Sequence, residues 1–266
     1  LRTQGRALLT AGKASEARTV LEKAVAGAPG DGAARVLLSL AHEKLGNGQQ
    51  AEAQLTALVA QDPGSAFGRR ALAELRLRSG KQSEALAALA PLLEGPSPDG
   101  AAMLLAGRIG LATGDLSNSL AMLERAVAIR PDDAASVLPL AQAYLLAGRV
   151  DDAVSALKSF SGADSKDARD AMLALAALQG QELPEALDLA TRVARDDRSS
   201  KSERSLVITV LASPALPEGG KSVLQELADK DPRSVQPRLA LAGLLDARGD
   251  FTGALRNYAA VLKLEP

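Results

Sequence analysis

The stretch AASVLPLAQAYLLAGRVDDAVSALKSF, residues 134–160, carries the pattern that decides the fold. Its first half places apolar residues at helical spacing, which predicts an amphipathic helix over residues 135–147 with a wide apolar face. Gly148 follows, as glycine does where a helix ends in a left-handed residue. Asp151 and Asp152 then stand in the first turn of a second helix, where carboxylates complement the helix dipole. The stretch is therefore predicted to form two helices joined at a glycine.

A small residue of the second helix recurs along the whole chain, at intervals of 34 residues with a single interval of 33. Its positions are Ala17, Ala51, Ala85, Ser119, Ala153, Ala186, Gly220 and Ala254. A glycine stands five residues earlier at Gly12, Gly46, Gly80, Gly114, Gly148 and Gly249. A proline, which cannot continue a helix interior, stands twelve residues later at Pro29, Pro63, Pro131, Pro232 and Pro266. This period is typical of a stacked array of helix pairs.

These positions resemble the tetratricopeptide repeat over nearly the whole chain, as about eight repeats of which the first lacks its opening residues. Further matches to that family are Gly5, Gly107, Tyr144, Ala24 and Ala126. The resemblance implies an all-α fold, a right-handed α-solenoid or superhelix, with an inner groove lined by the first helix of each pair. The predicted repeats are approximately 1–31, 32–65, 66–99, 100–133, 134–166, 167–200, 201–234 and 235–266.

We expect residues 1–266 to form a single array that is a fragment of a longer chain. The sequence starts at Leu1 inside a helical pattern, without a start methionine or signal peptide, and Pro266 closes a repeat. No apolar run approaches the roughly 20 residues that span a bilayer. The chain is 47% hydrophobic but only 2% aromatic, so its core must pack leucine against alanine.

Two departures from the family pattern matter for packing. The signature tryptophan is replaced by arginine at Arg35, Arg69, Arg204 and Arg238, whose stems we expect to cover apolar surface while their charged heads reach water. Residues 161–234 fit worst, because they contain the one-residue deletion and Arg198 replaces a repeat-ending proline. Pro184, Pro214 and Pro217 also crowd the helix starts of this region, and Gly219 and Gly220 lie within a second helix, where each glycine costs about 0.5–1 kcal/mol relative to alanine. We expect the least stable or most bent part of the array here.

The residues that usually carry chemistry are scarce. The formal net charge is −1, from 31 basic and 32 acidic residues, whereas nucleic-acid binding relies on a basic excess. The chain has no cysteine, and His42, its single histidine, is expected to be partly buried at a helix interface. A histidine-based metal site and a Cys–His pair are therefore excluded. The sequence predicts no enzyme, no metal, no cofactor and no nucleic-acid partner.

The resemblance places first-helix side chains along the inner groove. The charged members are Arg2, Arg6, Arg70, Glu74, Arg78 and Arg108. The remaining members are Leu104, Leu111, Leu138, Gln142, Leu145, Leu146 and Leu175. This predicts a basic stretch running into an apolar one, which suits an extended or helical partner with acidic and apolar portions. The alternative is that the arginines form a solvated face and the leucines pack between neighbouring helices.

The tracts at 104–133 and 237–266 are similar to bacterial envelope repeat proteins of the PEP-CTERM/exosortase and exopolysaccharide systems. That similarity implies a periplasmic protein or outer-membrane lipoprotein rather than a cytoplasmic one. The expected function is a non-catalytic scaffold that binds a protein or peptide. Two alternatives remain: an export component that contacts polysaccharide, and an array that self-associates through exposed ends near Leu255, Tyr258, Val261 and Leu262.

Overall fold

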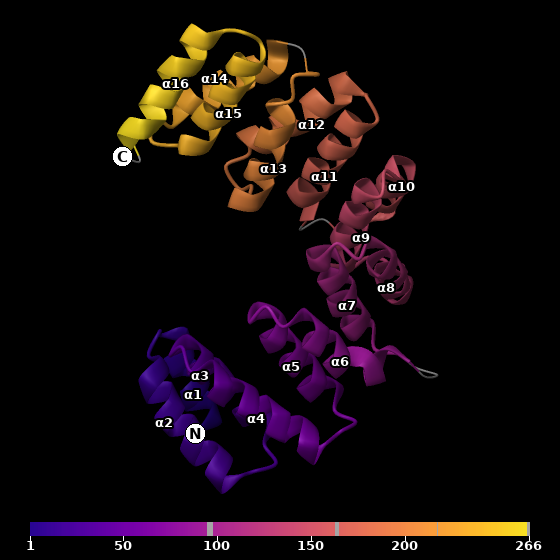
Figure 1. Ribbon diagram of the computed structural model, residues 1–266, viewed down its shortest axis with the longest axis vertical. Coiled ribbons are helices and arrows are strands. Elements are labelled where there is room, and N and C mark those ends of the chain that lie inside the picture. Colours follow the sequence, from indigo (N-terminus) through magenta and orange to yellow (C-terminus); the bar gives the residue numbers. More distant parts are fainter. Residues whose placement is uncertain (95–97, 163–164, 217, 265–266) are drawn as a thin grey trace. The chain divides into compact units, whose positions relative to one another are not determined.

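The computed structural model describes residues 1–94, 98–162, 165–216 and 218–264, and within these ranges all regular structure is helical (Figure 1). The chain divides into two compact units, Leu1–Ile129 and Arg130–Pro266. The helices of the first unit are α1 (Arg2–Thr10), α2 (Ala14–Gly27), α3 (Gly32–Lys44), α4 (Gly48–Gln61), α5 (Ala66–Arg78), α6 (Gln82–Leu93), α7 (Gly100–Thr113) and α8 (Leu116–Ile129). Those of the second are α9 (Ala134–Leu146), α10 (Val150–Ser159), α11 (Lys166–Gln179), α12 (Leu183–Arg195), α13 (Lys201–Leu211), α14 (Glu218–Lys230), α15 (Val235–Ala247) and α16 (Phe251–Leu264).

Helix pairing follows one rule in both units. Each odd-numbered helix packs on the even-numbered helix that follows it and, within its unit, on the next odd-numbered helix. The predicted all-α fold of paired helices is therefore confirmed. Each predicted repeat range holds one pair, except that α11 begins one residue before 167. One continuous array over residues 1–266 stays a prediction. Among the described helices, none combines the length and the apolar character that a bilayer crossing requires.

The glycines predicted to end the first helices do so in the left-handed conformation. Gly12, Gly46, Gly80, Gly114, Gly148 and Gly249 have φ between 72° and 79°. After α9, the Gly148 N–H donates to the Leu145 carbonyl (3.1 Å) and the Arg149 N–H donates to the Tyr144 carbonyl (2.8 Å). These bonds satisfy two of the last carbonyls of the helix. In the sixth pair, Gln181 occupies the same place with φ 63°, although it is not a glycine.

The eight small residues of the second helices are all buried, as the period predicts. At Gly220 the requirement is strict, because a Cβ atom there would lie 2.5 Å from the carbonyl oxygen of Leu211. Glycine is therefore required by packing at this position, although it lowers the intrinsic stability of the helix. Four of the predicted prolines, Pro29, Pro63, Pro131 and Pro232, follow the ends of second helices. Pro217 and Pro266 lie outside the described residues.

The arginines that replace the family's tryptophan bind backbone carbonyls. Arg69 donates from Nε to the Pro63 carbonyl (2.7 Å), and Arg35 makes the same bond to the Pro29 carbonyl (3.0 Å). Arg204 reaches the carbonyls of residues 197 and 199, and Arg238 reaches that of residue 228. These charged heads therefore stay partly exposed, as expected, but they are also bonded to the backbone. Carbonyls at and after a helix end lack intrahelical donors, and the guanidinium groups supply them.

The seventh pair is the irregular one. Helices α13 and α14 pack against each other less extensively than the helices of any other pair. Their connection carries no left-handed glycine; instead Leu216 is buried in it, and its carbonyl accepts a hydrogen bond from Arg248 Nη2 (2.7 Å). The irregularity expected within 161–234 is thus located at this pair. Its lower stability stays a prediction.

Candidate functional site

A cleft of about 410 Å³ lies between three first helices of the first unit, α3, α5 and α7, and is called here the first-helix groove. Its lining residues are Val36, Phe67, Arg70, Ala71, Glu74, Ala101, Leu104, Leu105 and Arg108. Four of the predicted binding residues, Arg70, Glu74, Leu104 and Arg108, are therefore brought together in one cleft. Because the cleft lies within one compact unit, its geometry depends only on helices that pack on one another.

The apolar part of the first-helix groove includes an unusually accessible aromatic ring. Phe67 is 49% exposed, in the first turn of α5. That turn is fixed by Ser65, whose hydroxyl oxygen accepts a hydrogen bond from the Gly68 N–H (3.2 Å). Leu104 is half-buried beside the buried Leu105. An exposed ring next to an apolar floor is the arrangement that anchors a partner side chain in many interfaces.

The basic stretch predicted along the groove is largely neutralised by neighbouring repeats. Arg70 Nη1 lies 3.0 Å from both carboxylate oxygens of Asp99. Arg78 donates two hydrogen bonds, of 2.7 and 3.0 Å, to the Glu43 carboxylate, and this pairing raises the pKa of Arg78. Arg2 pairs with Asp31 in the same way as Arg70 with Asp99. The positive charge of the predicted basic stretch is therefore reduced, because Arg2, Arg70 and Arg78 each already pair with an acid, and its role in partner binding stays a prediction.

Asp99 is itself a structural group. Its Oδ1 accepts the N–H groups of Ala101 and Ala102 at 2.9 Å, which caps the N-terminus of α7. Asp31 caps α3 similarly, and the hydrogen bond from the Ala34 N–H, followed by that from Arg2, lowers the pKa of Asp31. Arg2 and Arg70 therefore each link one first helix to the N-terminus of the next first helix.

Arg108 differs from the other cations of the groove. Its side chain is exposed, and among the described residues no hydrogen bond or ion pair forms at its guanidinium. The side chain of Arg6 on α1 is also exposed, but it does not line the cleft. Glu74 lies one turn before Arg78, which it meets at 3.9 Å. Arg108 is thus the cation of the first-helix groove that is available to a partner's carboxylate.

The remaining predicted residues do not join this cleft. Leu111, on α7, is half-buried and does not line the cleft. In the second unit, Leu138 and Leu175 are half-buried and pack against core clusters, while Gln142 is exposed. Leu145 is only 5% exposed and packs with Leu157 in the core, so its prediction as a partner-binding residue is corrected. For Leu145 the alternative therefore holds, because its side chain packs between neighbouring helices.

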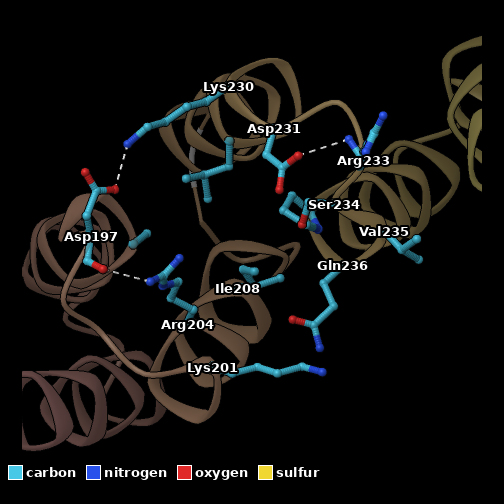
Figure 2. Close-up of a pocket in the computed structure, with 13 residues that line it drawn as sticks. Asp197, Lys201, Arg204, Ile208, Lys230, Asp231, Arg233, Ser234, Val235 and Gln236 are labelled. Atoms are coloured by element: carbon cyan, nitrogen blue, oxygen red, sulfur yellow. Dashed lines mark hydrogen bonds and ion pairs between the residues drawn. The ribbon is translucent and has the colours of Figure 1, made fainter. Parts of the chain in front are cut away.

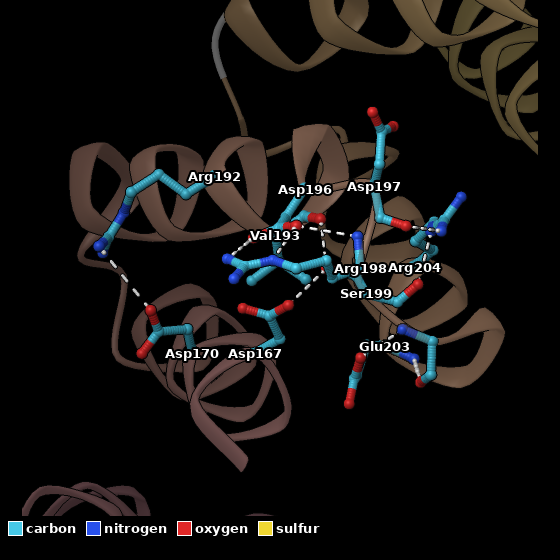
Figure 3. Close-up of polar contacts among 11 residues, drawn as sticks. Asp167, Asp170, Arg192, Val193, Asp196, Asp197, Arg198, Ser199, Glu203 and Arg204 are labelled. Atoms are coloured by element: carbon cyan, nitrogen blue, oxygen red, sulfur yellow. Dashed lines mark hydrogen bonds and ion pairs between the residues drawn. The ribbon is translucent and has the colours of Figure 1, made fainter. Parts of the chain in front are cut away.

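Sequence reasoning missed a larger cavity in the second unit, of about 810 Å³, between α13, α14 and α15 (Figure 2). Figure 3 shows the polar contacts of the connection 196–200, of which Asp197 lines the cavity. There the Arg198 guanidinium, together with its backbone N–H, lowers the pKa of Asp196 to about 2. The buried Ser199 hydroxyl lies 2.9 Å from both Asp167 Oδ2 and the Val193 carbonyl. A polar stretch that looks like a loose loop is therefore a hydrogen-bonded turn.

The geometry offers little to acid–base chemistry. His42 is 8% exposed, as expected for a histidine at a helix interface, and burial lowers its pKa. Its Nδ1 has no hydrogen-bond partner among the described residues. Across the described part of the chain, no group of three or more histidine, cysteine or acidic side chains is arranged to hold a metal ion.

Comparison with known proteins agrees with this fold. Family models described as tetratricopeptide repeat match residues 8–75 and 110–178 in one form and residues 70–134 in another. The solved structure of PilW, a widely conserved type IV pilus biogenesis factor, shares 17% identity and a TM-score of 0.63, covering 77% of this chain and 96% of PilW. The solved structure of PilF from Pseudomonas aeruginosa shares 14% identity and a TM-score of 0.60, covering 76% of this chain and 93% of PilF.

A third solved structure is YrrB, described as a TPR protein with an unusual peptide-binding site. It shares 14% identity and a TM-score of 0.53, covering 67% of this chain and 93% of YrrB. No curated protein sequence gives a significant match. At these identities the likeness to the solved structures shows the fold alone.

Proposed function

Because the chain belongs to the tetratricopeptide repeat family, we propose that it is a non-catalytic scaffold that binds a protein or peptide segment in the first-helix groove. The observation that carries this proposal is that an exposed ring, Phe67 on α5, and a cation without a partner among the described residues, Arg108 on α7, line the same cleft. A partner with an apolar side chain for the floor and a carboxylate for Arg108 satisfies both.

The charge distribution narrows the partner further. Arg70 and Arg78 are already bound to acids, so a long polyacidic segment gains few new ion pairs in the groove. One carboxylate next to an apolar anchor suits the lining better than a run of acids. The partner is therefore expected to be an extended or helical segment in which a single acidic residue stands close to a large apolar one.

The test is a quantitative capture experiment with a matched control. The variant Phe67→Ser/Arg108→Glu is compared with Phe251→Ser/Arg256→Glu, whose residues are exposed on α16. Both variants change one ring and one cation, and circular dichroism checks that both stay folded. Partners lost from the first variant and kept by the second support the groove. Identical partner profiles for wild type and the first variant contradict it.

We also propose a bacterial envelope setting, within exopolysaccharide machinery, and its support is the resemblance of the tracts at 104–133 and 237–266. Localisation of the protein by cell fractionation tests this setting, and a cytoplasmic protein contradicts it. Direct contact with polysaccharide is less well supported, because sugar rings stack on aromatic side chains and Phe67 is the one aromatic side chain that lines the first-helix groove.

Self-association is a second candidate with its own observation. Helix α16 exposes Phe251, Leu255 and Leu262, each by more than 60% of its surface. Exposed apolar faces on a repeat helix favour stacking on a further helix pair. Light scattering over a concentration series measures this directly, and a mass that stays monomeric throughout excludes it.

A further inference from the structure

The cavity of the second unit results from the splayed seventh pair. At one end, α14 is held tightly: Cβ atoms at Gly219 and Gly220 would lie 2.5 Å from Leu187 Cδ2 and from the Leu211 carbonyl oxygen, respectively. At the other end, the last turn of α14 separates from the first turns of α13. The space between them, about 810 Å³, falls in the range of ligand sites. Close packing at the N-terminal end of α14, where the two glycines lie, thus accompanies an open space at its C-terminal end.

The floor of this cavity is apolar. Ala194 and Ile208 are almost fully buried, and Leu227 and Val235 are half-buried around them. In Figure 2, Ile208 lies on α13 among the charged side chains that ring the space. An apolar floor of this kind gives affinity to a partner side chain that leaves water to enter it.

The rim of the cavity has an excess of positive charge. Four cations, Lys201, Arg204, Lys230 and Arg233, line it with two acids, Asp197 and Asp231. Lys230 Nζ is paired with Asp197 Oδ1 (2.9 Å), and the Asp231 carboxylate accepts the Arg233 backbone N–H (3.1 Å). These bonds occupy both acids of the rim.

Of the remaining three cations, one binds backbone carbonyls, and the side chains of the other two have no partner among the described residues. Arg204 donates to the carbonyls of Asp197 and Ser199 and so belongs to the wall. For the side chains of Lys201 and Arg233, no hydrogen bond or ion pair forms among the described residues. Figure 2 shows them on different sides of the space, one on α13 and one before α15. The rim therefore offers two separate positive charges above an apolar floor.

The N-terminus of α15 adds to the same preference. Ser234, its N-cap residue, makes no side-chain hydrogen bond to the first turn. Val235 and Gln236, which follow it, line the cavity. N–H groups at a helix N-terminus without a side-chain cap favour an anionic acceptor.

We propose that this cavity is a second binding site, for an acidic peptide segment that places an apolar side chain between α13 and α14 and carboxylates on Lys201 and Arg233. The site shares no residue with the first-helix groove, and it uses second helices and connections as well as first helices. A small inorganic anion leaves the apolar floor uncovered. A nucleic-acid backbone brings a density of phosphates that two cations beside two acids do not match.

The probe is a fluorophore-labelled, acetylated hexapeptide of sequence Asp-Glu-Leu-Leu-Glu-Asp, whose binding is followed by fluorescence anisotropy. Two further peptides separate the contributions, one with serine in place of both leucines and one with lysine in place of all four acids. We expect the first peptide to bind the wild-type chain at least about tenfold more tightly than either of the others, because charge and apolar contact act together.

The variant Lys201→Glu/Arg233→Glu is expected to weaken this binding by at least about tenfold. Its matched control is Lys23→Glu/Arg256→Glu, which reverses two exposed cations elsewhere and changes net charge equally. A third variant, Leu227→Trp, fills the cavity and is expected to abolish binding with the helical circular dichroism retained. The variant Phe67→Ser/Arg108→Glu is expected to bind this peptide as tightly as the wild-type chain does. A failed prediction for the cavity is therefore distinguishable from a failed prediction for the first-helix groove.

Three results overturn the proposal. An equal loss in the control variant shows a general charge effect. Equal affinity for the serine-containing peptide, with full displacement by inorganic phosphate, shows a bare anion site. No measurable preference of the wild-type chain for the acidic, leucine-containing peptide shows that the cavity does not recognise this chemistry.

Discussion

Replacing Gln181 by glycine is expected to stabilise the sixth helix pair. Gln181 has φ 63° and follows α11 as Gly148 follows α9. Its N–H donates to the Leu178 carbonyl (3.2 Å) and the next N–H, of Glu182, donates to the Ala177 carbonyl (2.8 Å), which is the same bonding pattern as after α9. The hydrogen bonds therefore already exist, and the left-handed backbone of a residue with a Cβ atom is the cost that glycine removes.

The magnitude follows from two opposing effects. A left-handed conformation costs a residue with a Cβ atom about 1–2 kcal/mol. Glycine adds freedom to the unfolded chain, which offsets about 0.4–1 kcal/mol of this gain. The exposed Gln181 side chain makes no hydrogen bond to the described residues, so little else is lost. A net stabilisation of about 0.5–1 kcal/mol is expected.

The assay must report on this pair, because the stability of stacked repeats is partly local. Native-state hydrogen exchange of the amides in α11 and α12 provides that readout, with urea unfolding as the global measurement. Gly148→Gln is the reciprocal control and is expected to lower protection in α9 and α10 by a similar amount. Gln181→Ala, which keeps a Cβ atom, is expected to leave protection nearly unchanged. If Gln181→Gly slows exchange no more than Gln181→Ala does, the left-handed backbone at this position carries no such cost.

Three further predictions rest on packing and protonation. Gly220→Ala is expected to destabilise the chain by about 1–3 kcal/mol, although alanine is the better helix former, because the new Cβ atom meets the Leu211 carbonyl; urea unfolding measures it. Ala153→Leu is expected to cost a similar amount by overpacking a fully buried site, and lost hydrogen-exchange protection in α9 and α10 would show it. Because burial lowers the pKa of His42, the unfolded chain binds its proton more readily, so stability is expected to fall as pH drops through and below the ordinary value of 6.5. Urea unfolding of His42→Leu at several pH values should show a smaller slope in that window, and an unchanged slope would contradict the assignment.

The parts of the fold that could be predicted from the sequence depend on short-range rules. A glycine at a helix end, a proline two residues beyond a helix and a small residue at a helix crossing each act within one repeat, as Gly148, Pro63 and Ala153 show. The period then repeats these rules along the chain. The sequence of a regular repeat therefore contains enough information to place its two helices.

The charges of the groove required information from neighbouring repeats. Arg2 and Arg70 each pair with an acid 29 residues later, Asp31 and Asp99, and that acid caps the next first helix. The two arginine–aspartate pairs share this separation of 29 residues, which can be read from the sequence. The bond from Arg78 back to Glu43 has no such regular counterpart, since it depends on how α3 and α5 approach each other.

Two departures from the repeat pattern have different physical outcomes. At Gln181 the glycine is missing but the left-handed backbone is kept, so the pair packs normally at a local cost in conformation. At the matching place of the next repeat, Ala215, the left-handed turn is also gone, and the glycines instead stand at 219 and 220, against Leu187 and Leu211. There the packing of the pair itself changes, and α13 and α14 splay apart around a cavity. Because each pair contacts only its neighbours, one repeat can open such a space while the others keep their geometry. An irregular repeat is therefore a place where a stacked fold can carry a binding site that its regular repeats do not have.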